Sequence, residues 1–453
     1  MSTTASAAAS PTPTPPLFVR GSIMRHVAVM ASTGAIGLIA VFLVDLLSLF
    51  YVSRLGDRSL TAAVGFAGVV GFFHISVSIG MMIGVAASVA RSVGAGEGPI
   101  ARRLATSSLM GVAALALVVG IATFALAGPV LDLLGADGPT HAHAVTYLRT
   151  VCLSFPLMAC GMSGAALLRS VGAARQAMNV SVVAAVVAAI LDPILIFGLH
   201  LGLNGAAISV VASRIVLASL ALRYTALVHE LLGPLEPQRL REDLTKVLAV
   251  AAPAILTNLA TPVAAGLVTH ALAGFGPAAV AGQATIDRIT PVAFGLAYAT
   301  TAAVGPIMAQ NRGAARPDRV RLTLRCSLAF VTVTVAVSWS ALALLQNQIV
   351  AVFAASGITA QLVRLFCSVL AGAFIFTGAL FVANASFNNL GRPLLSTAFN
   401  WGRATLGTIP FIALGAHYGP AGVLIGQAAG SVLFGLLATC AAIWLTAPGR
   451  VTA

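Results

Sequence analysis

Charged side chains are scarce in this sequence: acidic and basic residues make up only 8% of it, against about 25% in an average globular domain. Hydrophobic residues make up 59%. This composition excludes an ordinary soluble domain and indicates an integral membrane protein. Because long apolar runs are typical of helical spans, whereas barrel strands give only weak alternating patterns, we expect an all-α protein.

Lysine is almost absent, so the net charge of +13 rests on arginine and on Lys246 alone. The arginines stand mostly between hydrophobic segments, which is how basic residues set membrane topology. They follow alternate segments, for example at Arg102 and Arg175, while the connections in between carry almost none. This pattern predicts two cytoplasmic chain ends and no nucleic-acid partner.

Cysteine is also scarce, and the five cysteines show no paired spacing. We expect them to pack as small hydrophobic residues rather than form disulfides or a metal site. The first 22 residues are rich in Ala, Ser, Thr and Pro and lack the charged start of a signal peptide. Residues 1–22 are therefore predicted to be a disordered cytoplasmic tail.

The hydrophobic segments, bounded by Gly, Pro and charge, predict twelve transmembrane helices, six on each side of one charged, Pro-rich stretch. We expect an N-terminal six-helix lobe at residues 23–229 and a cytoplasmic linker at 230–243. The C-terminal six-helix lobe then occupies residues 244–448. At roughly 20 residues per span, the chain is long enough for this arrangement.

The two predicted lobes repeat each other. Gly94-Ala95 matches Gly313-Ala314, and Gly172 matches Gly391, both at an offset of 219 residues. Six spans per half give the two repeats the same topology. Transporters use this arrangement, with the substrate path between the halves.

One predicted span, residues 180–199, carries a single charge, Asp192, followed at once by Pro193. A central Asp costs about 2.5–3.5 kcal/mol, which the apolar residues of the span outweigh. Pro193 has no N–H, so a carbonyl near Ala189 loses its helical partner. A kinked backbone beside a carboxylate suits an ion or proton site; the alternative is that Asp192 braces a packed bundle.

Three of the twelve acidic residues fall at membrane depth: Asp45, Asp192 and Asp287. Asp45 and Asp192 belong to the same half, and two carboxyl groups in one desolvated cavity both favour the protonated form. The alternative is a structural pair satisfied by Ser or Arg neighbours. Asp287 either pairs with a basic group such as Arg403 or lines a cavity and faces a cationic substrate.

Several motifs resemble the multidrug and toxic compound extrusion (MATE) family, in its DinF-like rather than eukaryotic type. They are VDLLSLFYVSRLGDRSLTAAVGFAG, the two Gly-Ala loops, LLRSVGAARQAM and ILDPILIFGLHLGLNGAAISVV, and they cover nearly the whole chain after residue 20. The resemblance implies two pseudo-symmetric six-helix lobes around a central cavity, in the bacterial inner (cytoplasmic) membrane. It also implies export of small organic, often cationic, compounds in exchange for H⁺ or Na⁺, and coupling acids at Asp45 and Asp192. We expect a monomer without cofactors.

The sequence departs from the family at two positions near Asp192. Some members have an Asn and a Thr that supply oxygen to Na⁺, where this chain has Ala188 and Val210. Since a hard cation needs several oxygen ligands, the departure favours H⁺ coupling. Na⁺ stays an alternative, because Ser181, Ser209 and backbone carbonyls also offer oxygen.

The remaining candidates are polar residues within predicted spans. Arg214 is a candidate partner that would neutralise Asp192 and weaken the proton hypothesis. Besides Asp287, the candidates for a substrate cavity are Gln283, Asn258, Tyr298 and Asn384, and the candidate charge partners are Arg214, Arg288 and Arg403.

Three other kinds of function compete with a proton-driven exporter. A flippase for lipid-linked precursors would need a basic cavity, which Arg214, Arg288 and Arg403 could form. An intramembrane enzyme would need a metal cluster, paired acids or a nucleophile–base set, and the sequence offers none of these. A channel fits less well, because repeated halves with an acid near the midplane favour alternating access.

Overall fold

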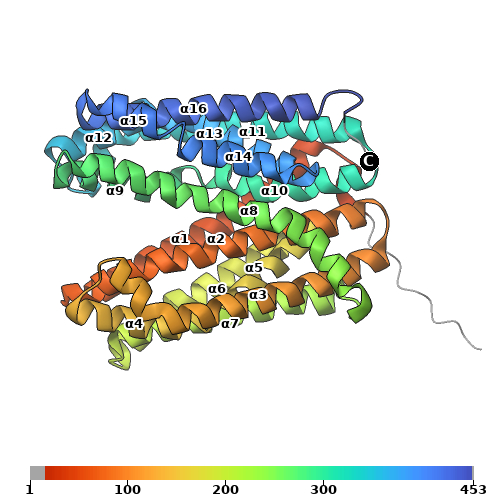
Figure 1. Cartoon of the computed structure of the whole chain (residues 1–453), viewed down its shortest axis with the longest axis horizontal. Coiled ribbons are helices and arrows are strands. Elements are labelled where there is room, and N and C mark those ends of the chain that lie inside the picture. The colour runs from red at the N-terminus through yellow and green to blue at the C-terminus, as the bar shows by residue number, and fades with distance from the viewer. Residues whose placement is uncertain (1–15, 451–453) are drawn as a thin grey trace, which may run out of the picture.

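The computed structural model describes residues 16–450; residues 1–15 and 451–453 lie outside it. Within that part the chain is helical, without strands, and forms two groups of helices that lie side by side (Figure 1). The first group comprises η1 (Leu17–Val19), α1 (Ile23–Ser53), α2 (Arg58–Gly94), α3 (Gly98–Leu133), α4 (Gly138–Cys152), α5 (Phe155–Ser170), α6 (Ala174–Pro193), the π-helical turn η2 (Ile194–Gly198), α7 (Gly202–Arg223) and η3 (Tyr224–Val228).

The second group repeats this order. It comprises α8 (Pro237–Ala273), α9 (Pro277–Ala293), α10 (Gly295–Gly313), α11 (Pro317–Val352), α12 (Gly357–Ser368), η4 (Leu370–Ala373), α13 (Phe374–Asn389), α14 (Pro393–Ala404), α15 (Ile409–Ala416) and α16 (Gly419–Leu445). We call the end of the bundle where α1 begins and α16 ends the termini end, and the opposite end the distal end.

The spans agree with the predicted twelve. In residues 16–450, nine helices are long and apolar enough to cross a membrane, and two bent pairs raise the number to 11: α4–α5, bent by 48°, and α9–α10, bent by 51°. The broken segment α14–α15 corresponds to the remaining predicted span but is not among these 11. The all-α membrane fold is confirmed.

Prolines explain where several of these helices break. Pro156 stands in the first turn of α5 and lacks the N–H that would continue α4. Pro291 stands inside α9, two residues before its end, and takes one N–H out of the last turn of that helix. As predicted, the backbone also changes at Pro193, where α6 ends and a π-helical turn begins. A break leaves backbone carbonyls without helical partners, so other groups can bind there.

The two halves meet at the termini end through the glycines that the repeat pairs. A Cβ atom at Gly94 of α2 would overlap the carbonyl oxygen of Gln310 in α10, and one at Gly313 would overlap that of Arg91. Only glycine allows the two backbones to approach so closely. The sequence repeat therefore marks a crossing point between the halves.

The segment before α1 packs into the same end. Phe18 is 1% exposed; its N–H donates to Gln310 Oε1 (2.9 Å), and its carbonyl accepts from Arg319 Nη2 (2.8 Å). Residues 1–15 of the predicted disordered tail, residues 1–22, lie outside the described residues. Residues 16–22 differ from the prediction, because Phe18 is buried between the halves and η1 forms around it, while Leu17 stays exposed.

At the distal end the halves are not packed together. Three glycines in the first half of α2, and Gly266 in the second half of α8, have no atom within 4 Å of the position that a Cβ would take. Gly84, nearer the termini end of α2, would clash with Ala251 of α8. The three glycines of α2 are Gly65, Gly68 and Gly71. The helices that line the boundary between the halves therefore separate towards the distal end.

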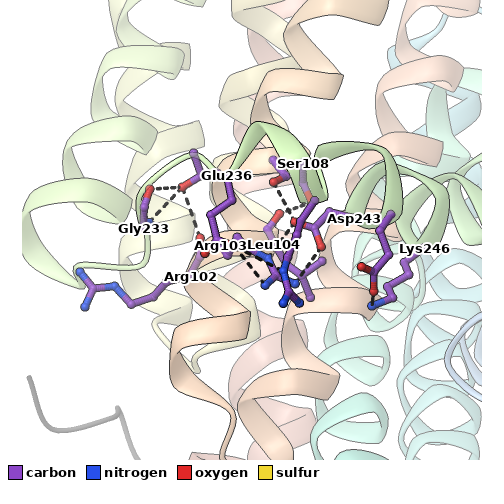
Figure 2. Close-up of polar contacts among 12 residues, drawn as sticks. Arg102, Arg103, Leu104, Ser108, Gly233, Glu236, Asp243 and Lys246 are labelled. Carbon is purple, nitrogen blue, oxygen red and sulfur yellow. Dashed lines mark hydrogen bonds and ion pairs between the residues drawn. The ribbon is translucent and has the colours of Figure 1, made fainter. Parts of the chain in front are cut away.

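A buried ion pair ties the start of α8 to α3 (Figure 2). Asp243 is 0% exposed and accepts two bonds from Arg103, from Nε to Oδ2 and from Nη2 to Oδ1, both at 3.1 Å. Ser107 Oγ also donates to Oδ2 (2.9 Å). Glu236, just before α8, lies 3.7 Å from Arg103 Nη1. The predicted linker therefore contains the first turns of α8, and the division at residues 230–243 stays a prediction.

Candidate functional site

Asp192 is placed by the last turn of α6, between α1 and α7. Its side chain is buried, at 1% exposure, and its Oδ1 atom has no hydrogen-bond partner. The hydroxyl groups of Ser48 from α1 and Ser209 from α7 lie beside the carboxyl group. Ser209 Oγ also donates to the carbonyl of Ala188, one turn earlier in α6 (3.3 Å). The surroundings are polar but leave one carboxyl oxygen without a donor.

Asp45 lies on α1, two turns before its distal end, and its side chain is exposed. Arg214 and Asp192 are the charged groups close enough to influence its carboxyl group. Within the described part of the chain, neither Asp45 nor Asp192 has a basic nitrogen within 4.0 Å. The structure thus brings together the two acids singled out in the sequence, one exposed and one buried.

Arg214 of α7 does not neutralise these acids by a direct ion pair, which was the alternative considered from the sequence. Its Nη1 atom donates instead to the carbonyl of Val151 (2.9 Å) and to Ser154 Oγ (2.9 Å). Val151 belongs to the last turn of α4, where unpaired carbonyls carry partial negative charge. Arg214 therefore binds the α4–α5 break rather than the two carboxyl groups, because the free carbonyls at the end of α4 attract its positive charge.

Tyr147 of α4 completes this cluster and was missed in the sequence. It lies close enough to Arg214, Asp45 and Asp192 for their charges to act on it. Its only signal was rarity, since the chain has five tyrosines. His74 of α2 is adjacent: its Nε2 pairs with Thr123 Oγ1 (2.9 Å), and its ring stacks on Phe155 at 4.3 Å.

The candidate residues of the second half fall into two groups. Asp287 of α9 is exposed and accepts from Gln283 Nε2 (2.8 Å), one turn earlier. The suggested pair with Arg403 is not formed in residues 16–450, where no ion pair involves Asp287. Tyr298 lies near both charges. The Nε atom of Arg403 is buried without a hydrogen-bond partner, and Arg288 is exposed.

Aromatic rings surround Tyr298. Its ring lies 5.6 Å from Phe374 and 5.2 Å from Phe381, and Phe294 stacks on Phe374 at 4.2 Å. Such a group of rings next to a carboxylate and a guanidinium can accept a flat molecule with charge of either sign.

The two asparagines among the candidates serve the helices themselves. Asn384 is 6% exposed, accepts from Asn400 Nδ2 (3.0 Å) at its side chain and from Ser396 Oγ (3.2 Å) at its carbonyl. Asn258 Nδ2 donates to the carbonyl of Ala254 in its own helix (2.8 Å). Asn384 is therefore a bridge between α13 and α14 rather than an open cavity wall.

A small cavity lies between the halves towards the termini end. It measures about 30 Å³ and is lined from both halves, by Arg169 of α5 and by Thr301 and Asn389, among others. This is room for about one water molecule. The two halves are thus closely packed at the termini end, around the small cavity. They are separated towards the distal end, on the side where Asp45 and Asp287 are exposed.

Comparisons with known proteins agree with this architecture. The family model MatE matches residues 35–194 and 253–414. The FAD transporter of Shewanella oneidensis is 28% identical over 414 residues, which is 90% of this chain and 91% of that protein. The multidrug export protein MepA of Staphylococcus aureus strain NCTC 8325 is 24% identical over 79% of each chain.

Solved structures show the same fold. An outward-facing multidrug resistance MATE transporter of the MOP superfamily superposes with a TM-score of 0.90, at 20% identity, over 96% of this chain and 99% of that one. A point mutant of the Vibrio cholerae MATE transporter VcmN gives 0.88, at 24% identity, over 93% and 96%. The chain therefore belongs to the MATE family: it is a bacterial multi-pass membrane transporter of small molecules and not an enzyme.

Proposed function

We propose that this transporter is an antiporter that exports small organic, often cationic, compounds in exchange for protons, through protonation of Asp45 and Asp192. The observation that supports this most is the buried Oδ1 atom of Asp192, which has no partner. An ionised carboxylate there lacks a donor for one oxygen, whereas a bound proton removes the charge. Exposed Asp45 stands beside it as the group that exchanges protons with water.

The proposal includes an orientation in the bacterial inner membrane with both termini in the cytoplasm. Arginines gather at the termini end, at Arg91 in α2, Arg102 in α3 and Arg316 before α11, as cytoplasmic loops require. The unpacked distal end then faces outwards, so a proton from the outside reaches Asp45 first. When the halves exchange open and closed ends, the proton leaves to the cytoplasm. We expect one chain to suffice, as a monomer.

Na⁺ coupling is the less favoured alternative. A sodium ion needs several oxygen ligands at once. Near Asp192, Ala188 contributes only its carbonyl, which already accepts from Ser209, and Val210 contributes no side-chain oxygen. A single proton needs only one free carboxyl oxygen, which Asp192 has.

A second candidate substrate class is a flat anionic dinucleotide such as FAD. The Shewanella relative is an FAD transporter and aligns with 90% of this chain. Arg403, with its unpartnered Nε, lies near the ring of Tyr298 and offers a positive charge beside an aromatic surface. The flippase alternative loses support, because Arg214 is engaged by the α4–α5 break and does not contribute to a basic cavity.

Proteoliposomes with imposed gradients test the proposal. We expect a pH gradient to drive ethidium transport by the wild-type protein and a Na⁺ gradient at matched pH to drive none. Asp192→Asn should abolish the pH-driven transport, because Asn binds no exchangeable proton. FAD offered in the same vesicles separates the two substrate classes.

Asp57→Asn is the matched control. Asp57 caps α2 from the loop, and its contacts with Ser59 hold the pKa of its carboxyl group below the usual value. It therefore stays ionised across the assay, and its replacement should leave coupling intact. Transport by wild-type protein on a Na⁺ gradient alone would overturn the H⁺ assignment, and full activity of Asp192→Asn would remove Asp192 from the mechanism.

A further inference from the structure

A lateral groove opens on the first half, at the α4–α5 break. It has a volume of about 440 Å³ and lies between α3 and α7. Figure 1 shows α3, α4 and α7 along the edge of the first half that is turned away from the second half. The groove is therefore separate from the boundary between the halves, and it faces the surrounding lipid; its lining residues are Phe124, Arg149, Thr150, Leu153, Ser154, Leu157, Ile208 and Val211.

Most of the lining is apolar and has no protein partner. Leu153, which lies between α4 and α5, is 60% exposed, and Ile208 of α7 is 44% exposed. The bend of 48° between α4 and α5 leaves this space open. An acyl chain fits such a wall, since it replaces no hydrogen bond and covers apolar surface.

Arg149 is the one charged residue of the lining. Its Nε atom donates to the carbonyl of Phe124 (3.3 Å), and its guanidinium lies 5.3 Å from the centre of the Phe124 ring. The side chain is exposed, and no ion pair in residues 16–450 includes it. An arginine has five donors in a planar fork, so the outer edge of this guanidinium is free to bind a phosphate group.

The depth of Arg149 matches the level of lipid headgroups. The 36 residues of α3 extend over roughly 54 Å, about 24 Å more than the hydrocarbon core. If the excess is divided between both ends, the core boundary lies about 12 Å before Leu133. Phe124 stands nine residues, or about 14 Å, before that end. Arg149 therefore lies at the boundary where phosphates meet acyl chains.

We propose that this groove binds an anionic phospholipid from the distal leaflet, with its phosphate on Arg149 and an acyl chain along Leu153 and Ile208. The occupant has a consequence for the α4–α5 break. Ser154, which lines the groove, is bonded to Arg214 Nη1 (2.9 Å). The lipid covers the outer side of the same break that Arg214 holds from within, and so it stabilises the helices around Asp45 and Asp192.

Thermal unfolding of the purified full chain in detergent tests this proposal, with three additions at equal concentration: phosphatidylglycerol, phosphatidylcholine and inorganic phosphate. We expect phosphatidylglycerol to raise the Tm most and phosphate alone to have no effect. Arg149→Gln should weaken the apparent affinity for phosphatidylglycerol by about tenfold, since a charged hydrogen bond is lost.

Arg54→Gln is the matched control, because Arg54 is likewise exposed at the distal end and lies 5.0 Å from the ring of Phe50, but it lies outside the groove. Leu153→Trp keeps Arg149 and fills the space for the acyl chain, so it should weaken the phosphatidylglycerol effect as well. An unchanged response of Arg149→Gln would overturn the proposal. An equal loss of phosphatidylglycerol affinity in Arg54→Gln would show a general charge effect and overturn the proposal. An equal rise in Tm with phosphatidylcholine would mean that the groove does not select an anionic headgroup. An equal rise with phosphate alone would mean that no acyl chain is bound.

Discussion

At the scale of single residues, the two acids of the first half differ in what surrounds them. Asp45 is exposed and Asp192 is buried with an unpartnered oxygen. Arg214, the nearest basic residue, is bonded to Val151 and Ser154 instead. Arg214 is close enough to act on Asp45 but forms no ion pair with either acid in residues 16–450, as the proposed proton exchange requires.

Asp243 gives a prediction about stability at this scale. Its carboxylate is fully buried and receives three hydrogen bonds, two of them from Arg103. Asp243→Ala leaves the buried guanidinium with only the half-exposed Glu236, at 3.7 Å, so we expect a loss of about 3 kcal/mol in unfolding free energy, the lower end for a broken buried pair. Denaturant or thermal unfolding in detergent measures it.

The control for this prediction is the neighbouring exposed pair. Lys246 Nζ lies 2.7 Å from Glu242 Oε1, and both side chains are about half exposed. Exposed pairs contribute little, so Glu242→Gln should leave the unfolding midpoint unchanged. If the two variants unfold alike, the Arg103–Asp243 pair adds no more than a surface contact.

The limits of the sequence are visible at this scale. Asp45, Asp192 and Asp287 could be found because a carboxylate inside a long apolar run is conspicuous. Tyr147, Arg149 and the partner of Asp243 could not, since each depends on a side chain from another helix. The suggested pair between Asp287 and Arg403 fails for the same reason. The sequence does not show how far apart two side chains on different helices lie.

At the scale of helices, the candidate site residues lie next to breaks in the helices. α6 changes at Pro193 next to Asp192, and α4 ends at the residues that Arg214 binds. The spans and the Pro193 break were readable from hydrophobic runs and from proline. The division of later spans into α12–α13 and α14–α15 was not, because Thr405 to Thr408 and Val369 lie in sequences that read as continuous apolar helix.

Gly94 gives the prediction for helix packing. A Cβ atom there would overlap the carbonyl oxygen of Gln310, so Gly94→Ala must push α2 away from α10. We expect the closed termini end to open and the cavity near Thr301 to become accessible. In a variant without native cysteines, Thr301→Cys should react several-fold faster with a water-soluble maleimide when Gly94→Ala is also present.

Gly65→Ala on the same helix is the control, since no atom lies within 4 Å of its Cβ position. It should leave the labelling rate of Thr301→Cys unchanged. Equal labelling with and without Gly94→Ala would mean that the α2–α10 crossing does not keep this end closed.

At the scale of the whole molecule, two repeated halves are packed at one end and separated at the other. Gly94 and Gly313, paired by the sequence repeat, form the packed crossing, and the Arg103–Asp243 pair lies at the same end. Asp45 and Asp287 are exposed on the open side. This form, closed at one end and open at the other, is what the proposed alternating access needs.

The most direct test of proton coupling is the release of protons when a substrate binds. Ethidium is added to the purified transporter in weakly buffered detergent solution, and a pH indicator records the change. If Asp45 and Asp192 hold the coupling protons, wild-type protein acidifies the solution on binding, and Asp192→Asn binds ethidium while releasing fewer protons. Equal proton release by both proteins, or binding by the wild type with no release at all, would contradict the account.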